Sequence, residues 1–348
     1  MAATADEEHR SGRTMRVAIR AIATHLPDTV LSNDELAGLY PEWPAHKILE
    51  KTGIRERRIA AEGETAADLA FHAANKLFDA GGVARAEIDF VILCTQAPDH
   101  VLPTSACILQ ERLGLRRDIG ALDINLGCSG FVYGLAMGGG LIQSGAASNV
   151  LLLTADTYSK FINAGDKSVR TLFGDGAAAT LVSASTVADM GPFVFGTDGS
   201  GAEDLIVRAG GARMPRSASS ALEEEEGGNV RSLDNLYMNG PRVMAFALRE
   251  VPRTFHRLLE MTGRTADDVD YVVLHQGNRF MLDALQKKLD LPAHKVPRGY
   301  EEVGNTVSST IPFVLETLMD NGQMAPGTRV MLIGFGVGLS WAGTVVTC

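Results

Sequence analysis

The amino-acid sequence predicts an α/β fold built from two copies of one unit. Segments with helical spacing of apolar residues alternate with short apolar runs that are typical of buried strands. The run AEIDFVILCT at 86–95 aligns with DDVDYVVLHQ at 267–276, and LGCSG around Cys128 aligns with VGNTV around Asn305. NVLLLTA at 149–155 aligns with RVMLIGF at 329–335, in the same order. We therefore expect a fused duplication, with one half at 15–185 and the other at 186–348.

Local patterns predict the elements in chain order. A strand is expected at 17–23, and Ser32, followed by two acidic residues, is typical of a helix start. The basic segment 52–60 is expected to be a loop, and 65–78 has helical spacing before a Gly-Gly stop. Buried strands are expected at 88–95, 119–124, 149–156 and 171–183, and helices at 104–113 and directly after Cys128.

Composition argues against several functional classes. The chain has 348 residues, 45% of them hydrophobic, and its net charge of −10 disfavours nucleic acid or an anionic membrane as the main partner. No apolar run approaches the length of a membrane span. The polar segment 1–14 is expected to be a disordered tail, and its lack of an apolar core predicts a cytoplasmic protein with reduced thiols. No metal site is predicted, because neither CxxC nor Cys/His spacing occurs; Cys94 and Cys107 are expected in the core, and Cys348 is terminal.

Cys128 is the candidate nucleophile. It lies where the strand-like run IGALDIN gives way to a helix, so the free N–H groups of the first helical turn are expected to lower the pKa of its thiol. Neighbouring glycines allow a substrate carbonyl to approach the backbone closely. A lone cysteine is more often a small buried apolar residue, and this turn alone leaves that alternative open.

His275 and Asn305 are the candidate partners of Cys128. Each is expected just beyond the carboxyl end of a strand, where ligands of α/β sheets gather, so the three side chains can meet in a cleft between the halves. Two neutral donors, an imidazole Nε2 and a carboxamide, suit the stabilisation of an enolate that forms when CO2 leaves. The alternatives are a structural histidine and a helix-capping asparagine. A backbone N–H in the glycine-rich segment 334–343 is expected to complete an oxyanion hole with the amide of Cys128.

Two further segments are charged or irregular. Residues 209–236 lack periodicity and include the run EEEE at 223–226, so a solvated loop is expected, with a flap over a substrate channel as the alternative. A basic cluster surrounds the helix after His275 and could be a solvated face or a docking site for an acidic carrier protein. Its members are Arg279, Lys287, Lys288, Lys295 and Arg298.

Together, these motifs resemble the β-ketoacyl-acyl carrier protein synthase III family of the thiolase superfamily. The resemblance covers nearly the whole chain after residue 15, and includes TGIRERRIA, the Cys128 turn, FGDGAAAT, HQGN where the family usually has HQAN, GNTVSS and FGVGLSWAG. It implies a thiolase-like fold of five layers, α-β-α-β-α, and a homodimer without metal or cofactor. It also implies a decarboxylating Claisen condensation of malonyl-acyl carrier protein with an acyl starter from acyl-CoA or an acyl-carrier protein, in fatty-acid or specialised-metabolite biosynthesis.

The resemblance implies roles for individual residues. Cys128, His275 and Asn305 would be catalytic, and the amides of Cys128 and Val337 would form the oxyanion hole. The acyl pocket would involve Phe173, Met244 and the partner subunit's Leu102. Residues implied along pantetheine and CoA are Lys51, Lys167, Met238, Gly240 and Asn278, and those implied in carrier docking are Arg279, Lys287 and Lys288.

Some positions depart from the family pattern. Lys47 stands where some members have a tryptophan that stacks on adenine, and Trp43 lies a short way upstream. Lys51 and Lys167 stand where some members have phosphate-binding arginines, and Val337 replaces the middle glycine of the last motif. These departures and the long 209–236 segment favour a specialised starter, or a donor delivered on a carrier protein.

Two other functions are compatible with the same residues. A non-decarboxylating acyltransferase of this fold would move the acyl group from Cys128 to an alcohol, an amine or a carrier thiol. An inactive partner subunit would typically lack the nucleophile, and Cys128 is present. Asn305 favours condensation, because its carboxamide is suited to stabilise the enolate that forms when the malonyl carboxylate leaves as CO2.

Overall fold

The computed structural model describes residues 16–348, and the predicted tail at 1–14 lies outside the described residues. Its first sheet contains β1 (Arg16–His25), β4 (Phe90–Cys94), β5 (Gly120–Ile124), β6 (Asn149–Asp156) and β7 (Gly176–Ser185), in the order β1-β7-β6-β4-β5. β4 runs parallel to both β5 and β6, and β7 is antiparallel to β6 and β1. The strand β4 is apolar and largely buried because helices cover both faces of the sheet.

The second sheet repeats most of this pairing. It contains β8 (Asp189–Thr197), β13 (Tyr271–Leu274), β14 (Arg329–Gly336) and β15 (Ser340–Thr347), in the order β13-β14-β15-β8. β13 is parallel to β14 as β4 is to β6, and β15 is antiparallel to β14 and β8 as β7 is to β6 and β1. Within residues 16–348, β5 has no counterpart in this second sheet. The expectation that Asn305 follows a strand equivalent to the one before Cys128 is therefore wrong.

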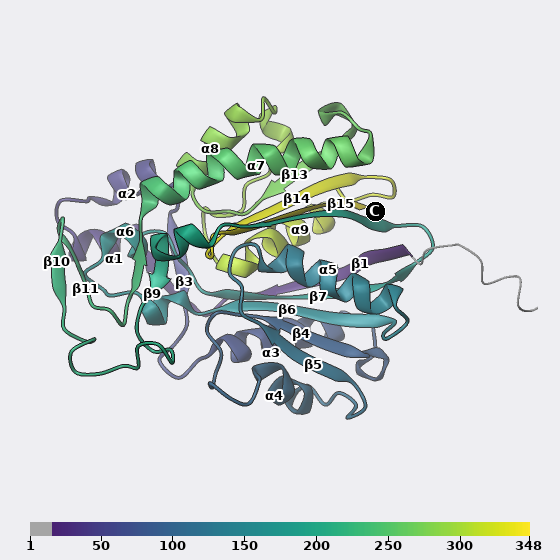
Figure 1. The fold of residues 1–348 in the computed structure, drawn as a ribbon, viewed down its shortest axis with the longest axis horizontal. Helices are drawn as coiled ribbons and strands as arrows, with labels where there is room; N and C mark the ends of the chain where they lie inside the picture. The colour runs from purple at the N-terminus through teal and green to yellow at the C-terminus, as the bar shows by residue number, and fades with distance from the viewer. Residues whose placement is uncertain (1–15) are drawn as a thin grey trace, which may run out of the picture.

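The main helices complete five layers around the two sheets (Figure 1). One pair covers the outer face of the first sheet, a second pair lies between the sheets, and a third covers the outer face of the second sheet. These pairs are α3 (Ala66–Asp79) with α4 (Ser105–Arg112), α5 (Gly130–Gln143) with α9 (Thr310–Asp320), and α7 (Gly240–Thr262) with α8 (Arg279–Lys288). The α-β-α-β-α arrangement of a thiolase-like fold is thus confirmed.

Small residues let α5 lie directly on the first sheet. A β-carbon at Gly130 would lie 2.2 Å from the Sγ of Cys94, and one at Gly134 would lie 2.5 Å from Leu152. Phe131 on the same helix is fully buried in the apolar cluster between the sheets. This close packing fixes the N-terminal end of α5, and with it the position of Cys128.

Several local predictions hold and two do not. Ser32 caps α1 (Asn33–Leu39) in a reciprocal box with Glu35, and Thr65 caps α3 in the same way. The segment 52–60 is predicted to be a loop, but it begins with the last residue of α2 (Ala45–Thr52) and includes the strand β3 (Glu56–Ile59). β3 pairs with β2 (Thr29–Ser32). Cys94 is buried as expected, but Cys107 is exposed on α4, because only one face of that helix packs on the sheet.

The segment 209–236 is more ordered than the sequence indicates. It contains the antiparallel hairpin of β10 (Glu224–Glu226) and β11 (Asn229–Arg231), and it leads into β12 (Leu236–Met238), which pairs with β9 (Leu205–Val207). The short helix α6 (Lys167–Arg170) lies beside this region. The expectation of an irregular loop is therefore wrong for the hairpin, whose polar strands are held by contacts from elsewhere in the chain.

Candidate active site

Three candidate side chains line one cavity of about 780 Å³: Cys128, His275 and Asn305. Cys128 lies between β5 and α5, His275 directly follows β13, and Asn305 lies in the connection between α8 and α9. They are only 4%, 4% and 6% exposed. The two halves therefore bring a thiol, an imidazole and a carboxamide to the same buried wall.

The Cys128 thiol packs against Gly336 at the end of β14. A β-carbon at Gly336 would lie 2.9 Å from both the Cβ and the Sγ of Cys128. Any residue larger than glycine at position 336 would therefore collide with the cysteine side chain. Burial, reinforced by the negative charge of Asp156, raises the pKa of the thiol well above its usual range. The expectation of a lowered pKa is wrong, because desolvation outweighs the backbone N–H groups at this turn. The resting sulfur is a neutral thiol.

The His275 imidazole is held by two contacts. Its Nδ1 lies 2.8 Å from the Oγ1 of Thr310, and its ring meets Phe335 edge-on, at 5.5 Å between ring centroids and 87° between planes. Burial lowers the pKa of His275 to about 3, so the ring is neutral around pH 7. A neutral, clamped imidazole is suited to donate a hydrogen bond from a fixed position.

Asn305 is positioned by backbone pairing with the first half. Its N–H donates to the Leu172 carbonyl at 2.9 Å, and its carbonyl accepts from the Gly174 N–H at 3.1 Å. Its side-chain Oδ1 accepts from the N–H of Val307 at 2.9 Å. The carboxamide NH2 makes no hydrogen bond to residues 16–348, so it is the group that remains for a ligand. A short 3-10 helix at Val307–Ser309 leads directly into α9, and Oδ1 of Asn305 accepts from its first N–H, so a capping contact is present and leaves the NH2 group available.

The mouth of the cavity contains most of the residues implied along the pantetheine arm. These are Lys51, Met238, Gly240 and Asn278. Trp43 also lies on the wall, with the Nζ of Lys51 5.4 Å from its ring centre. An aromatic face is thus present at the mouth, although the sequence places this tryptophan away from the family position.

Lys167 lies outside the cavity wall, which differs from its implied role in phosphate binding. Its Nζ is 2.9 Å from a carboxylate oxygen of Glu42 and donates to the carbonyl of Gly228 at 2.5 Å. The lysine therefore fastens the β10–β11 hairpin to the body of the protein.

The hairpin contributes residues to the cavity lining, and its role as a flap over a substrate channel stays a prediction. Glu226 and Arg231 line the cavity, while β10 itself is exposed to solvent. One guanidinium nitrogen of Arg231 lies 3.5 Å from a carboxylate oxygen of Asp166, and the other terminal nitrogen lies 3.6 Å from a carboxylate oxygen of Glu226. The hairpin therefore contributes one acidic and one basic side chain to the cavity that contains the buried thiol.

The residues implied in the acyl pocket separate into two groups. Phe173 and Met244 line the cavity with Cys128. Leu102 is 79% exposed and lies off that wall, so its implied role depends on a partner subunit. Val337 borders a neighbouring cavity of about 760 Å³ that shares Leu205 with the first one. The oxyanion-hole role of its amide stays a prediction.

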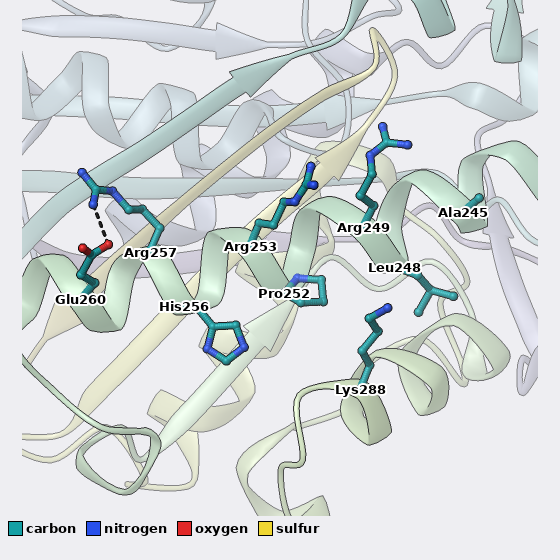
Figure 2. Close-up of a pocket in the computed structure, with 9 residues that line it drawn as sticks. All are labelled: Ala245, Leu248, Arg249, Pro252, Arg253, His256, Arg257, Glu260 and Lys288. Atoms are coloured by element: carbon teal, nitrogen blue, oxygen red, sulfur yellow. Dashed lines mark hydrogen bonds and ion pairs between the residues drawn. The ribbon is translucent and has the colours of Figure 1, made fainter.

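A separate basic hollow of about 840 Å³ lies between α7 and α8 (Figure 2). Arg249, Arg253 and Arg257 project from successive turns of α7 on the side away from α8. Lys288 extends from α8 toward the other side of α7, near Leu248 and Pro252. Each arginine has a carboxylate nearby, such as Glu260 at 2.6 Å from Arg257. This hollow contains none of the three candidate catalytic residues.

Two kinds of feature are absent from residues 16–348. No cluster of three or more histidine, cysteine or acidic side chains is arranged to hold a metal ion. None of the helices combines the length and apolar character that a membrane span requires.

Sequence reasoning missed three residues that shape the site: Thr310, Phe335 and Gly336. Phe335 and Gly336 lie in the FGVG motif, and that motif was a detectable signal for a close backbone contact. Thr310 follows the GNTVSS motif and gives no signal by itself, because its partner His275 is distant in the chain.

The fold and the cavity define a class: acyl-transferring enzymes of the thiolase-like fold with a buried cysteine. Residues 122–199 match the family model for 3-oxoacyl-[acyl-carrier-protein (ACP)] synthase III, and residues 259–348 match the model for its C-terminal part. The chain belongs to the β-ketoacyl-[acyl-carrier-protein] synthase III family, and the resemblance in the motifs is confirmed.

Individual relatives match over nearly the full length. The β-ketoacyl-[acyl-carrier-protein] synthase III of Chlamydia caviae is 34% identical over 336 residues, which cover 95% of this chain and 96% of that protein. A crystal structure of a 3-oxoacyl-(acyl-carrier-protein) synthase III is 62% identical with a TM-score of 0.94, covering 96% of this chain and 100% of the other. The 3-oxoacyl-(acyl-carrier protein) synthase from Burkholderia xenovorans is 36% identical with a TM-score of 0.87, covering 96% and 94%.

Proposed function

We propose that this chain catalyses a decarboxylating Claisen condensation between an acyl starter and malonyl-acyl carrier protein, through a thioester on Cys128. The meeting of Cys128, His275 and Asn305 on one cavity wall is the observation that carries the proposal. Family membership supports it, since the relatives are named as synthases of this kind.

In the first half-reaction, the Cys128 sulfur attacks the thioester carbonyl of the donor. A new C–S bond forms as the donor's C–S bond breaks, and the thiol proton passes to the leaving thiolate. Because the resting sulfur is a neutral thiol, proton removal accompanies the attack. The amides of Cys128 and Val337 are proposed to bind the transient oxyanion.

In the second half-reaction, the malonyl thioester loses CO2 and its electron pair becomes an enolate. His275 and Asn305 donate hydrogen bonds to the enolate oxygen, which lowers the barrier because both donors are already oriented in a buried site. The enolate carbon attacks the acyl carbonyl on Cys128. The thiolate then leaves and recovers a proton from solvent, so that the β-ketoacyl thioester departs.

The proposed donor channel runs past Lys51, Asn278, Met238 and Gly240, with Phe173 and Met244 around the acyl chain. Lys51 and Arg231 contribute positive charge to the cavity lining and Glu226 contributes negative charge, so the lining can meet the phosphate of a pantetheine arm.

The carrier protein is proposed to dock on α8 and the adjoining basic hollow. Lys287 and Lys288 are exposed at the end of α8. Arg279 at its start is partly committed, because its guanidinium donates to the Glu50 carbonyl. The row of arginines on α7 extends the basic surface that an acidic partner would meet (Figure 2).

A homodimer is proposed because β5 ends its sheet with half-buried side chains, an edge suited to a second copy. The exposed Leu102 fits the same assembly, since an apolar side chain so exposed gains by entering a partner. A cytoplasmic location and the lack of a cofactor or metal stay predictions.

Release of CO2 tests the proposed function against its alternative. The protein is incubated with an acyl-CoA panel and malonyl-acyl carrier protein, and CO2 and the mass added to Cys128 are followed. Cys128→Ala should abolish acyl-enzyme formation, whereas Asn305→Ala should acylate normally and release CO2 slowly. Acyl transfer to an alcohol, amine or carrier thiol without CO2 would support the non-decarboxylating acyltransferase. Equal loss of both half-reactions in Asn305→Ala would contradict the role given to this residue.

A further inference from the structure

We infer that Asp156 is a positioning residue that holds in place the turn containing Asn305, an inference that rests on the proposed function. Asp156 is the last residue of β6 and is fully buried, so its carboxylate depends on protein groups for hydrogen bonds. Neither half-reaction uses this carboxylate directly, although its negative charge lies near enough to Cys128 to raise the pKa of the thiol.

The carboxylate of Asp156 joins two segments that are distant in the chain. Its Oδ1 accepts from the backbone N–H of Gln96, two residues after β4, at 2.8 Å. Its Oδ2 accepts twice from Ser308, from the hydroxyl at 2.5 Å and from the N–H at 3.3 Å. All three groups are able to donate and a carboxylate only accepts, so the ionised side chain satisfies each of them with a charge-assisted hydrogen bond.

The turn that Asp156 holds has a strained residue at its centre. Val307 has a φ of 55°, a left-handed conformation that a β-branched residue rarely adopts and that persists only where neighbouring contacts hold it. The next residue, Ser308, is fastened to Asp156. Ser309 follows, and its hydroxyl donates to the Thr154 carbonyl at 3.0 Å. Both acceptors belong to β6, so one strand of the first sheet anchors the turn.

Val307 connects this anchor to the carboxamide of Asn305. The N–H of Val307 donates to Oδ1 of Asn305 at 2.9 Å, which fixes the plane of the carboxamide. A fixed plane also fixes the direction of the NH2 group, the donor that remains for the enolate. Without its acceptor, Ser308 releases Val307 to relax toward a negative φ, and the Val307 N–H then turns away from Asn305. Asp156 therefore acts on the carboxamide through Ser308 and Val307, without touching substrate.

Two substitutions separate this contact from the charge of the carboxylate. Ser308→Ala removes the hydroxyl donor and leaves the charge. Asp156→Asn removes the charge and offers one acceptor oxygen in place of two, so the N–H of either Gln96 or Ser308 loses its partner. Acylation is followed by the mass that acyl-CoA adds to Cys128. Decarboxylation is followed by CO2 release from malonyl-acyl carrier protein on the pre-acylated protein at about pH 8, where Asp156, with its pKa of about 7, is mostly ionised.

We expect both single variants to release CO2 on the order of 10-fold more slowly, because the carboxamide of Asn305 is no longer held in one orientation. Acylation should not slow in either variant, since loss of the charge at position 156 favours ionisation of the Cys128 thiol. The double variant should be no slower than the slower single variant, because both substitutions break the same contact.

Hydrogen exchange of the full-length protein gives a readout that is independent of activity. Backbone amides in the peptide 303–312 should exchange faster in Asp156→Asn and in Ser308→Ala than in the unchanged protein. Ser183→Ala is the matched control, because it removes a hydrogen bond of 2.6 Å to Asn149 at the opposite end of β6. We expect this control to change neither the exchange of the peptide nor the release of CO2.

Four results would overturn the inference. They are unchanged CO2 release in the single variants, losses that add in the double variant, equal slowing of both half-reactions, and unchanged exchange in the peptide 303–312. Faster CO2 release by Asp156→Asn would also overturn it, since the carboxylate would then act through its charge alone. If Asp156→Asn does not fold, CO2 release and hydrogen exchange in Ser308→Ala decide the inference.

Failure of the proposed function gives a different result. An unchanged protein that forms the acyl-cysteine but releases no CO2 would contradict the condensation. Hydrogen exchange in the peptide 303–312 would still show whether Asp156 holds the turn.

Discussion

Replacing Gly336 with alanine tests whether the nucleophile depends on a gap that only glycine leaves. The new Cβ would lie 2.9 Å from the Cβ and the Sγ of Cys128, whereas packed carbon atoms prefer about 3.5–4.0 Å. The cysteine side chain must therefore move by roughly 0.6–1 Å. The neighbouring backbone cannot easily yield, because a β-carbon on Gly334 would be just 2.7 Å from the Cys128 carbonyl oxygen.

Gly336→Ala should lower the stability of the protein slightly and the rate of acylation strongly. Overpacking of this kind costs about 1–3 kcal/mol of stability, which a protein of this size tolerates. A displacement of about 1 Å in a reacting atom lowers a rate on the order of 100-fold. We therefore expect a folded variant whose acyl-cysteine forms about 100-fold more slowly, measured as the time course of mass added by acyl-CoA alongside thermal unfolding.

Gly140→Ala on α5 is the matched control. A β-carbon there would meet no atom within 4 Å, so we expect unchanged acylation and a gain of roughly 0.5–1 kcal/mol from helix propensity. Acylation of Gly336→Ala at the rate of the unchanged protein, with equal labelling of Cys128 by iodoacetamide, would refute the reasoning. Equal slowing in both variants would point to a general effect of the substitutions.

Three further predictions follow from single contacts. Burial raises the pKa of Asp156 to about 7, so the folded state holds its proton more tightly than the unfolded state, and this group costs stability progressively from about pH 4 to pH 7. The free energy of unfolding of Asp156→Asn, measured relative to that of the unchanged protein, should increase as pH rises across that range. A difference that stays constant with pH would contradict this. Lys51→Ala should raise KM for acyl-CoA, whereas Lys167→Ala should loosen the hairpin and increase its proteolysis; the reverse pattern would contradict the assigned contacts. Gly277→Ala places a Cβ 3.0 Å from the Sδ of Met281, a flexible thioether that can move, so activity and thermal stability should change little; a large loss would show a rigid contact.

The sequence predicts the main strands because their information is local, whereas the five layers are implied by the family resemblance. A strand such as β4 is a continuous apolar run between polar turns, and its copy β13 carries the same pattern, so each supports the other. Cys128 and His275 were predictable for the same reason. Each follows directly on a recognisable strand, and carboxyl ends of strands mark ligand sites in α/β folds.

Other features could not be predicted because they depend on contacts between distant segments. The thiol pKa depends on how completely both halves bury Cys128, and an isolated helix start gives the opposite sign. From the sequence, Lys167 is a plausible phosphate ligand. In the fold, its ammonium group instead donates to the Gly228 carbonyl of the hairpin, a contact that the sequence does not indicate. Arg57 lies in a segment predicted to be a basic loop, yet it is fully buried and donates to Asn33 and the Thr171 carbonyl.

The departure from exact duplication explains why the site is asymmetric. In the first half, β5 pairs with β4 and delivers Cys128 directly to the start of α5. The corresponding segment of the second half joins no strand of its own sheet; Asn305 instead forms a parallel bridge with Phe173 of the first half. That pairing carries the connection before α9 across to the thiol, where it supplies the carboxamide of Asn305 and the hydroxyl of Thr310. One copy thus contributes the nucleophile, and the other contributes neutral donors, because the segments before the two helices pair with different partners.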